Sequence, residues 1–155
     1  MLNLKIIYKI IGQLLYIEAF MMATCIVMAY YYGEDDLMGF LFSTITTVVA
    51  ALVFRFLGKN ATDSLGRREA YLLVTTVWLI FSFFGALPFY ITGYLPHFTD
   101  AHFETMSGFT TTGASVIESV ELLPHSLKFW RSLTHWIGAL GIVFFTIAII
   151  PSLVG

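Results

Sequence analysis

Residues 107–115 read SGFTTTGAS, three consecutive threonines followed by a glycine. This polar stretch lies between two apolar segments, 70–95 and 132–155, and each of these is long enough to cross a bilayer. Irregular backbone is tolerated at membrane depth only where protein buries it or where it lines water. The stretch is therefore either an external loop or a loop that enters the membrane, and the rest of the sequence favours one of the two.

The composition is that of a membrane protein. Of the 155 residues, 58% are hydrophobic and only 12% are charged, whereas soluble domains are about 45–50% apolar. The net charge of −2 offers no basic surface for nucleic acid. Cys25 is the single cysteine, which excludes an internal disulfide and a cysteine-based zinc site. These features predict an all-α membrane protein.

Four segments have the length and apolar character of membrane spans. They are residues 10–32, 37–57, 70–95 and 132–155. The first is too long for the apolar core of a cleaved signal peptide, and no cleavage motif of small residues follows it. We therefore predict that all four segments are spanning helices, with the third kinked near its outer end by Pro88.

Basic residues gather on one side of the predicted spans. Six of the eight precede the first span or surround the link between the second and third: Lys5, Lys9, Arg55, Lys59, Arg67 and Arg68. The link GEDD at 33–36 is purely acidic. The positive-inside rule then predicts a cytoplasmic N-terminus. Tyrosines and tryptophans, Trp130 among them, are expected at the outer membrane interface.

The segment before the threonines has helix-compatible spacing over residues 99–108. Thr99 and Asp100 are plausible N-cap residues, and Gly108 is a natural stop. Such a helix is about 15 Å long, roughly half the hydrocarbon thickness. It can enter the membrane but cannot cross it, so the residues that follow are expected to be non-helical backbone at membrane depth.

A half-helix that enters from outside directs its negative carbonyl end toward the membrane centre, which suits a cation. Extended chain with inward carbonyls can replace the hydration shell of an alkali cation, and Gly113 permits the positive φ that turning a carbonyl often needs. The candidate ion-binding residues are Thr111, Thr112 and Gly113, with Thr110 and Ala114 as flanking contributors through backbone carbonyls. A polar external loop that is threonine-rich by chance stays open as the alternative.

Two long motifs carry a family resemblance. ETMSGFTTTGAS (104–115) followed by LLPHSLKFWRSLTHWIGALGIV (122–143) resembles the first pore loop and second pore helix of bacterial TrkH-type potassium transporters, in the Trk/Ktr/HKT superfamily. The upstream GRREAYLLVTTVWLIFSFFGALPFYITG (66–93) resembles the first pore helix of that family. The resemblance implies a potassium-channel-like fold and K⁺ uptake through a carbonyl-lined filter.

The resemblance also implies a domain plan. Residues 1–58 would form two peripheral helices, 59–69 a cytoplasmic link, and 70–155 the first pore repeat. Within that repeat it implies a helix at 70–95, a pore half-helix at about 99–108, a filter at 110–114 and a helix at 127–155. Potassium would be the transported ion, with no organic cofactor in this chain.

The same resemblance implies location and partners. It implies a homodimer in the cell inner membrane and a cytosolic nucleotide-binding regulatory subunit of the TrkA type. Family members carry four pore repeats, whereas these residues match one. We expect an N-terminal portion of a longer protein. Assembly of four copies remains an alternative, and so does a membrane fragment that associates with other chains but conducts nothing.

Several polar residues allow other functional or structural interpretations. Ser107 or Ser115 with His135 raises an intramembrane serine hydrolase, which is disfavoured because the strained turn that presents such a nucleophile is missing. Glu104 falls with neighbouring acids and histidines in a spacing that matches no metal signature, so a solvated cation entrance is expected. For Glu18, inside the first span, we expect a paired or hydrogen-bonded structural role. Gly138 is expected to allow close helix approach.

Overall fold

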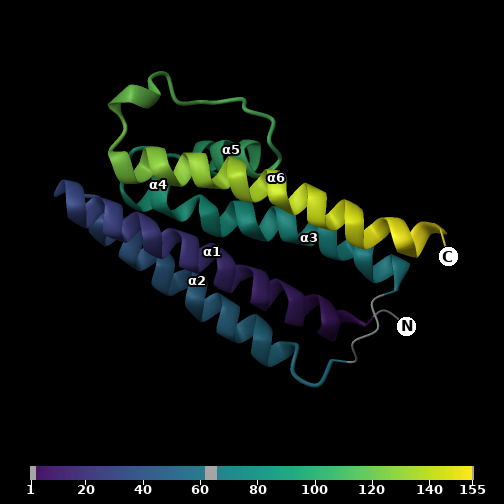
Figure 1. Cartoon of the computed structure of the whole chain (residues 1–155). Helices are drawn as coiled ribbons and strands as arrows, with labels where there is room; N and C mark the ends of the chain where they lie inside the picture. Colours follow the sequence, from purple (N-terminus) through teal and green to yellow (C-terminus); the bar gives the residue numbers. More distant parts are fainter. Residues whose placement is uncertain (1–2, 62–65, 155) are drawn as a thin grey trace.

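The computed structural model describes residues 3–61 and 66–154; for Arg67 and for residues 142–154 it describes the backbone alone. Within these ranges the regular structure is entirely helical. The elements are α1 (Leu4–Tyr32), α2 (Leu37–Leu57), α3 (Arg67–Gly85), α4 (Leu87–Ile91), α5 (Phe98–Phe109), the short 3₁₀ helix η1 (Val120–Leu122) and α6 (His125–Val154) (Figure 1).

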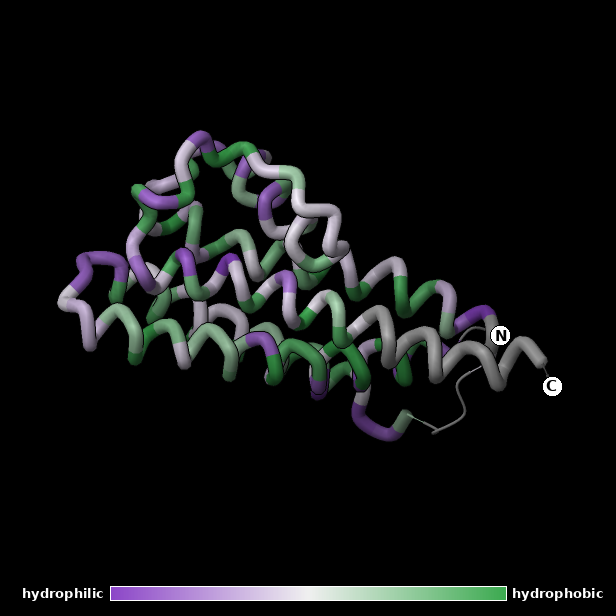
Figure 2. The backbone as a smooth tube through the Cα atoms, turned by 45° about the horizontal axis from the view of Figure 1, so that its top comes forward, coloured by the Kyte–Doolittle hydropathy of each residue, from purple (hydrophilic) through white to green (hydrophobic). Residues whose placement is uncertain are grey.

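The helices form an elongated bundle. The antiparallel pair α1 and α2 packs together along its length, and α1 also contacts α3 and α6. The short helix α5 packs against both α3 and α6. The start of α1 and the end of α6 lie at the same end of the bundle (Figure 1). Hydrophilic backbone stretches mark the two ends, at the turn after α1 and the turn after α2 (Figure 2).

Three helical stretches in the described residues are long and apolar enough to cross a membrane: Leu4–Tyr32, Leu37–Leu57 and Arg68–Ile91. They correspond to the first three predicted spans. The fourth prediction falls on α6, a continuous helix of 30 residues that runs along the bundle. Most side chains of that predicted span lie outside the described residues.

The first helix begins six residues earlier than predicted, at Leu4 instead of Ile10. The prediction placed the boundary after Lys5 and Lys9, because charged residues end an apolar run. The helix nevertheless continues through them, since Ile6 and Ile7 between these lysines are buried in the core. One buried face is enough to hold this amphipathic first turn in the bundle.

The predicted kink near Pro88 is confirmed. The third span breaks at Ala86 into α3 and α4, with Pro88 in the first turn of α4. Trp130 of α6 meets this break: its indole N–H donates to the carbonyl of Gly85 at 2.9 Å. Trp130 is completely buried, so its expected place at the membrane interface is wrong. It instead satisfies a backbone carbonyl at the helix break.

Glu18 also departs from expectation. It is completely buried in α1, and neither carboxylate oxygen has a hydrogen-bond partner among the described residues. Its side chain lies near Gly85, beside the methyl group of Thr105 and the ring of Phe109. The Thr105 hydroxyl donates to the carbonyl of Ala101 instead. Among the described residues, the expected paired or hydrogen-bonded role of Glu18 is therefore wrong.

The acidic link at 33–36 caps the start of α6. The Glu34 carboxylate accepts hydrogen bonds from the backbone N–H groups of His125, at 2.6 Å, and Ser126, at 3.1 Å. The ring of His125 lies 2.8 Å from the same carboxylate, and the Ser126 hydroxyl bonds to Asp36. A carboxylate at this position satisfies unpaired helix N–H groups and complements the helix dipole. The contact ties the α1–α2 pair to α6.

This cap predicts an acid dependence of stability. Partial burial opposes ionisation of Glu34, but hydrogen bonds from His125 and Ser126 outweigh it and lower its pKa from the ordinary 4.5. The cap therefore stabilises the fold above pH 4.5, and this contribution is lost as the pH falls through the lowered pKa. We expect Glu34→Gln to lower the melting temperature of the purified chain at neutral pH. The same variant should show a smaller further loss of melting temperature below pH 4.5.

Asp36 is the matched control, because burial raises its pKa from 3.8. Its contribution to the stability of the fold has the opposite pH dependence. This contribution is present below pH 3.8 and is lost as the pH rises through the raised pKa. Asp36→Asn should therefore still show the loss of melting temperature in acid. If the melting temperatures of the wild type and Glu34→Gln fell by equal amounts below pH 4.5, the role of the cap would be contradicted.

Candidate functional site

The helix α5 positions the threonine stretch. It covers Phe98–Phe109, one residue beyond the prediction at each end, and residues 110–114 that follow are non-helical. Its N-cap is His97, so the expected capping by Thr99 or Asp100 is wrong, although Asp100 still lies in the first turn. The extended φ and ψ of His97 explain the earlier start. A 12-residue helix is about 18 Å long, too short to cross a bilayer.

The last turn of α5 lies directly on α6. A methyl group on Gly138 would collide with the backbone carbonyl of Phe109, and one on Gly108 would collide with the Thr134 side chain. Both glycines and Phe109 are buried. The expected close approach at Gly138 is therefore confirmed, and it brings the backbone of α6 against the end of α5.

The end of α5 is a tight left-handed turn. The N–H of Thr111 donates to the carbonyl of Gly108 at 2.9 Å, and the N–H of Thr112 donates to that of Ser107 at 2.9 Å. These two bonds form a Schellman motif in which Thr111 takes the left-handed position, with φ of 57°. Gly108, the predicted stop, lies inside the helix. A positive φ is uncommon for a β-branched residue and costs of order 1–3 kcal/mol.

Gly113 has a second left-handed conformation two residues later, with φ of 77°. Among the described residues other than its two chain neighbours, no atom lies within 4 Å of the position that a β-carbon would take there. The need for glycine is therefore conformational and not a matter of space. The hydroxyls of Thr110 and Thr112 lie 2.9 Å apart, and Thr110 also donates to the carbonyl of Met106.

These two turns leave a row of carbonyls unengaged. Among the described residues, no donor is hydrogen-bonded to the backbone carbonyls of residues 110–113. Residues 111–114 are exposed on the surface of the chain. The carbonyl of Ala114 differs, because it accepts a hydrogen bond from the Ser107 hydroxyl at 2.6 Å. Consecutive unengaged carbonyls next to the negative end of a helix are suitable ligands for a desolvated cation.

Glu104 fixes the chain where it leaves this stretch. Its carboxylate accepts hydrogen bonds from the Ser115 hydroxyl at 2.9 Å and from the N–H of Val116 at 3.0 Å. It also pairs with the guanidinium of Arg131 on α6 at 2.7 Å. The Glu104 side chain is 1% exposed and that of Arg131 is 21% exposed. The expected solvated entrance is therefore wrong for Glu104, which joins α5, α6 and the returning chain.

The sequence alone does not indicate that Glu104 and Arg131 join α5 to α6. Closeness in sequence groups Glu104 with nearby acids and histidines, whereas its partner Arg131 lies 27 positions further on. Neither spacing nor composition indicates that α6 packs against α5. The available signal was the placement of a carboxylate on the face of α5 that carries Ala101, Thr105 and Gly108, all of which are buried.

The residues of the serine hydrolase alternative are engaged separately. Ser107 donates to the Ala114 carbonyl, and Ser115 donates to Glu104. A ring nitrogen of His135 lies 2.9 Å from the carbonyl of Arg131, one turn earlier in α6. In the part of the chain that the structure describes, no hydrogen bond joins either serine to His135. The arrangement therefore lacks the nucleophile–base contact that this chemistry needs.

Known proteins are similar to this chain in sequence and fold. The model of the TrkH family, described as cation transport protein, matches residues 37–155. The Trk system potassium uptake protein TrkH of Halomonas elongata is 32% identical over 153 residues, which cover 98% of this chain and 32% of that protein. The protein TrkG of Escherichia coli is 30% identical over 152 residues, covering 97% and 31%.

The solved structures agree. The crystal structure of the potassium transporter TrkH from Vibrio parahaemolyticus matches with a TM-score of 0.90 and 30% identity, covering 97% of this chain and 32% of that one. The chain thus spans about a third of the length of the relatives it matches.

Proposed function

This chain belongs to the TrkH family of cation transport proteins, and on that premise we propose that it forms one wall of a pore for potassium uptake. The family is one of transporters and not of enzymes. The chain is a membrane protein with an all-helical fold of the TrkH type. The potassium cargo, the filter and the partners are the parts that we propose.

The row of unengaged carbonyls at residues 110–113 carries the proposal. We assign ion binding to Thr111, Thr112 and Gly113, with Thr110 and Ala114 at the two limits of the filter. The Ala114 carbonyl already accepts a hydrogen bond from Ser107, so its contribution would be shared with that bond. Carbonyl oxygens stabilise a potassium ion by replacing its hydration shell, without a carboxylate in the filter.

One such wall supplies part of a coordination shell. The remaining ligands would come from further pore repeats or from other copies of the chain. We retain the orientation with a cytoplasmic N-terminus and α5 entering from outside, because most basic residues lie at the opposite end of the bundle from the acidic link 33–36. An inner-membrane homodimer with a TrkA-type cytosolic regulatory subunit completes the proposal.

A chimera tests the proposed function. Residues 1–155 would replace the corresponding segment of the Halomonas elongata relative, which aligns with 98% of this chain. In a bacterium that lacks its own potassium uptake systems, we expect the chimera to restore growth at low K⁺ and to take up Rb⁺. The parent protein is the positive control. A chimera that reaches the membrane in the same amount as its parent, yet supports neither growth nor uptake, would overturn the proposal.

A further inference from the structure

Glu18 is the only acidic residue within the four predicted spans, and the proposed filter does not use it. Its side chain is completely buried, and neither carboxyl oxygen has a hydrogen-bond partner among the described residues. Ionisable residues inside a membrane are rare and costly, and they commonly have a function. The surroundings of Glu18 indicate what that function is.

Glu18 lies where the break between α3 and α4 meets α5. A β-carbon on Gly85 would lie 3.0 Å from Oε1 of Glu18. It would also lie 2.6 Å from the methyl group of Thr105 and 2.9 Å from the ring of Phe109. These groups surround a single point, so Glu18 lies against the last two turns of α5. The main contacts of α1 are with α2, α3 and α6, and Glu18 extends this helix to α5 as well.

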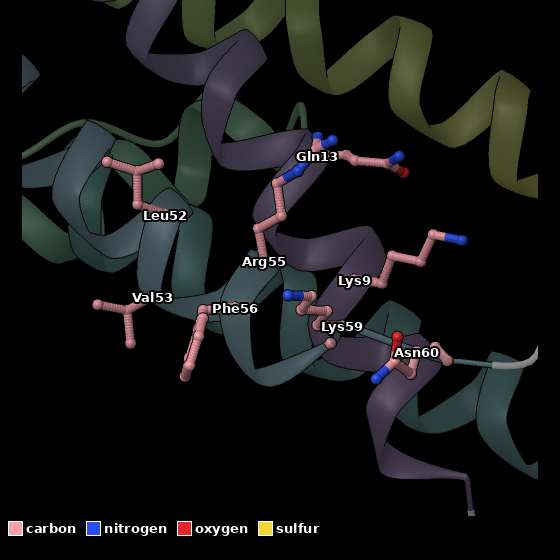
Figure 3. Close-up of a pocket in the computed structure, with 10 residues that line it drawn as sticks. Lys9, Gln13, Leu52, Val53, Arg55, Phe56, Lys59 and Asn60 are labelled. Carbon is pink, nitrogen blue, oxygen red and sulfur yellow. The ribbon is translucent and has the colours of Figure 1, made fainter.

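The charged residues of α2 and α3 lie away from this junction. Arg55 is the charged residue of α2, and its side chain extends toward Gln13, which precedes Glu18 on α1 (Figure 3). On α3 the charged residues are confined to the first turn, 67–69, whereas Gly85 is its last residue. Neither helix therefore brings a charged partner to Glu18.

The charged residues of α5 and α6 are engaged elsewhere or lie closer to the starts of these helices. Glu104 and Arg131 pair with each other at 2.7 Å, and a ring nitrogen of His135 lies 2.9 Å from the Arg131 carbonyl. The remaining acidic, basic and histidine residues of the two helices are Asp100, His102, His125 and Lys128. Among the described residues, none forms an ion pair with Glu18.

These surroundings suit a neutral carboxylic acid. An ionised carboxylate that is buried without a partner is far more costly than its protonated form. The methyl group of Thr105 and the ring of Phe109 provide no donor, and the Thr105 hydroxyl donates to the Ala101 carbonyl instead. The protonated group can occupy this apolar space between α1 and α5 without an unpaired charge.

Phe109 connects this space to the proposed filter. It is completely buried, and it is the last residue of α5, directly before residues 110–113. Gly138 of α6 packs on its backbone, whereas Glu18 and the aromatic ring both approach Gly85. The end of α5 therefore lies between a support from α6 and a support from α1.

We infer that Glu18 is held as a neutral carboxylic acid and is a positioning residue for the end of α5, and through Phe109 for residues 110–113. The peripheral pair α1 and α2 thereby supports the backbone that follows α5. The effect on ion selectivity rests on the proposed function. The protonated state and the support of α5 do not depend on conduction.

Two measurements on the purified chain in detergent at neutral pH test the inference. In the infrared spectrum we expect the C=O stretching band of a protonated carboxyl group, which Glu18→Gln should remove. By hydrogen–deuterium exchange we expect the amides of residues 110–113 to exchange about fivefold faster in Glu18→Ala, because the end of α5 loses a support. Glu18→Gln keeps the shape and the neutral state and should leave this exchange unchanged.

Met22 provides the matched control on the same helix. It lies one turn after Glu18 and is completely buried, and its sulfur faces the Thr47 hydroxyl of α2 at 3.7 Å. Met22→Ala therefore removes a buried side chain from the contact with α2. We expect a lower melting temperature with unchanged exchange at residues 110–113. If Glu18→Ala does not fold, Glu18→Asp, which is one methylene shorter, takes its place with the same expected result.

The chimera adds a test of selectivity. Glu18→Ala should reduce discrimination of K⁺ over Na⁺ about fivefold, whereas Glu18→Gln and Met22→Ala should not. A wild-type infrared spectrum without the band that Glu18→Gln removes would overturn the inference. Equal exchange at residues 110–113 in the Glu18 and Met22 variants would do so too. A parent chimera without Rb⁺ uptake would instead count against the proposed function, and the infrared and exchange results would still decide this inference.

Discussion

Replacing Gly113 by alanine in the chimera is expected to reduce discrimination of K⁺ over Na⁺ about tenfold. Alanine at the φ of 77° found here costs about 1–2 kcal/mol, and relaxation toward a negative φ would rotate the adjoining carbonyls. Carbonyls that leave their positions no longer match the shell that a potassium ion loses. The measurement is Rb⁺ uptake in the presence of increasing Na⁺, with growth at low K⁺ as a second readout.

Gly93 provides a closely matched control for this substitution. It has a φ of 80°, and as for Gly113, no described atom outside the two neighbouring residues lies within 4 Å of the position that an added β-carbon would take. Gly93→Ala therefore introduces similar backbone strain in the turn after α4, away from the proposed filter. We expect it to leave ion selectivity unchanged. Equal selectivity in Gly113→Ala and the parent chimera, or an equal loss in both variants, would remove Gly113 from the filter.

Glu104→Gln is expected to have the largest effect on stability. The substitution keeps the shape of the side chain but leaves the guanidinium of Arg131 without its anionic partner inside the bundle. It also replaces one acceptor oxygen by a donor amide near Ser115 and Val116. Removing one member of a buried ion pair costs about 3–5 kcal/mol, and the 21% exposure of Arg131 favours the lower value. The measurement is the melting temperature of the purified chain.

Variants of Arg131 and of the surface acid Glu121 test whether loss of the ion pair causes the loss of stability. Arg131→Gln combined with Glu104→Gln should recover part of the lost stability, because no uncompensated charge remains. Glu121→Gln changes an exposed acid of η1 whose carboxylate accepts a hydrogen bond from the nearby Ser119, and it should change the melting temperature little. In the chimera, Glu104→Gln should also weaken selectivity, because Ser115 and Val116, which follow the proposed filter, lose a carboxylate oxygen that accepts their hydrogen bonds. A Glu104→Gln protein as stable as Glu121→Gln would contradict the role of the ion pair.

Features that are local in sequence were predicted well. The bounds of α2, 37–57, match the prediction because an acidic link and a glycine delimit an uninterrupted apolar run. Pro88 locates the break in the third span because proline cannot continue a helix without losing a hydrogen bond. The approximate length of α5 follows from helix-compatible spacing, although the predicted stop, Gly108, lies inside the helix and the left-handed turn comes at Thr111.

Apart from the close approach at Gly138, contacts between distant segments were not predictable from this one sequence. Trp130 was expected at the interface because tryptophans are common there, but the carbonyl that it meets belongs to Gly85. Glu104 was expected in water because its partner Arg131 lies on a later helix. Glu18 was expected to find a partner, which no residue described around it supplies. Each error concerns a contact between helices, which hydropathy and spacing do not encode.

The left-handed turn at Thr111 bears on the order in which the chain assembles during synthesis. A β-branched residue rarely adopts that backbone conformation unaided, and an isolated helix as short as α5 is only marginally stable in water. The turn has its own hydrogen bonds to Ser107 and Gly108, but the helix that carries it is held by α6, through Arg131 and through the packing of Gly138 on Phe109. Because α6 leaves the ribosome after α5, we expect residues 110–114 to reach their final geometry only after α6 has docked.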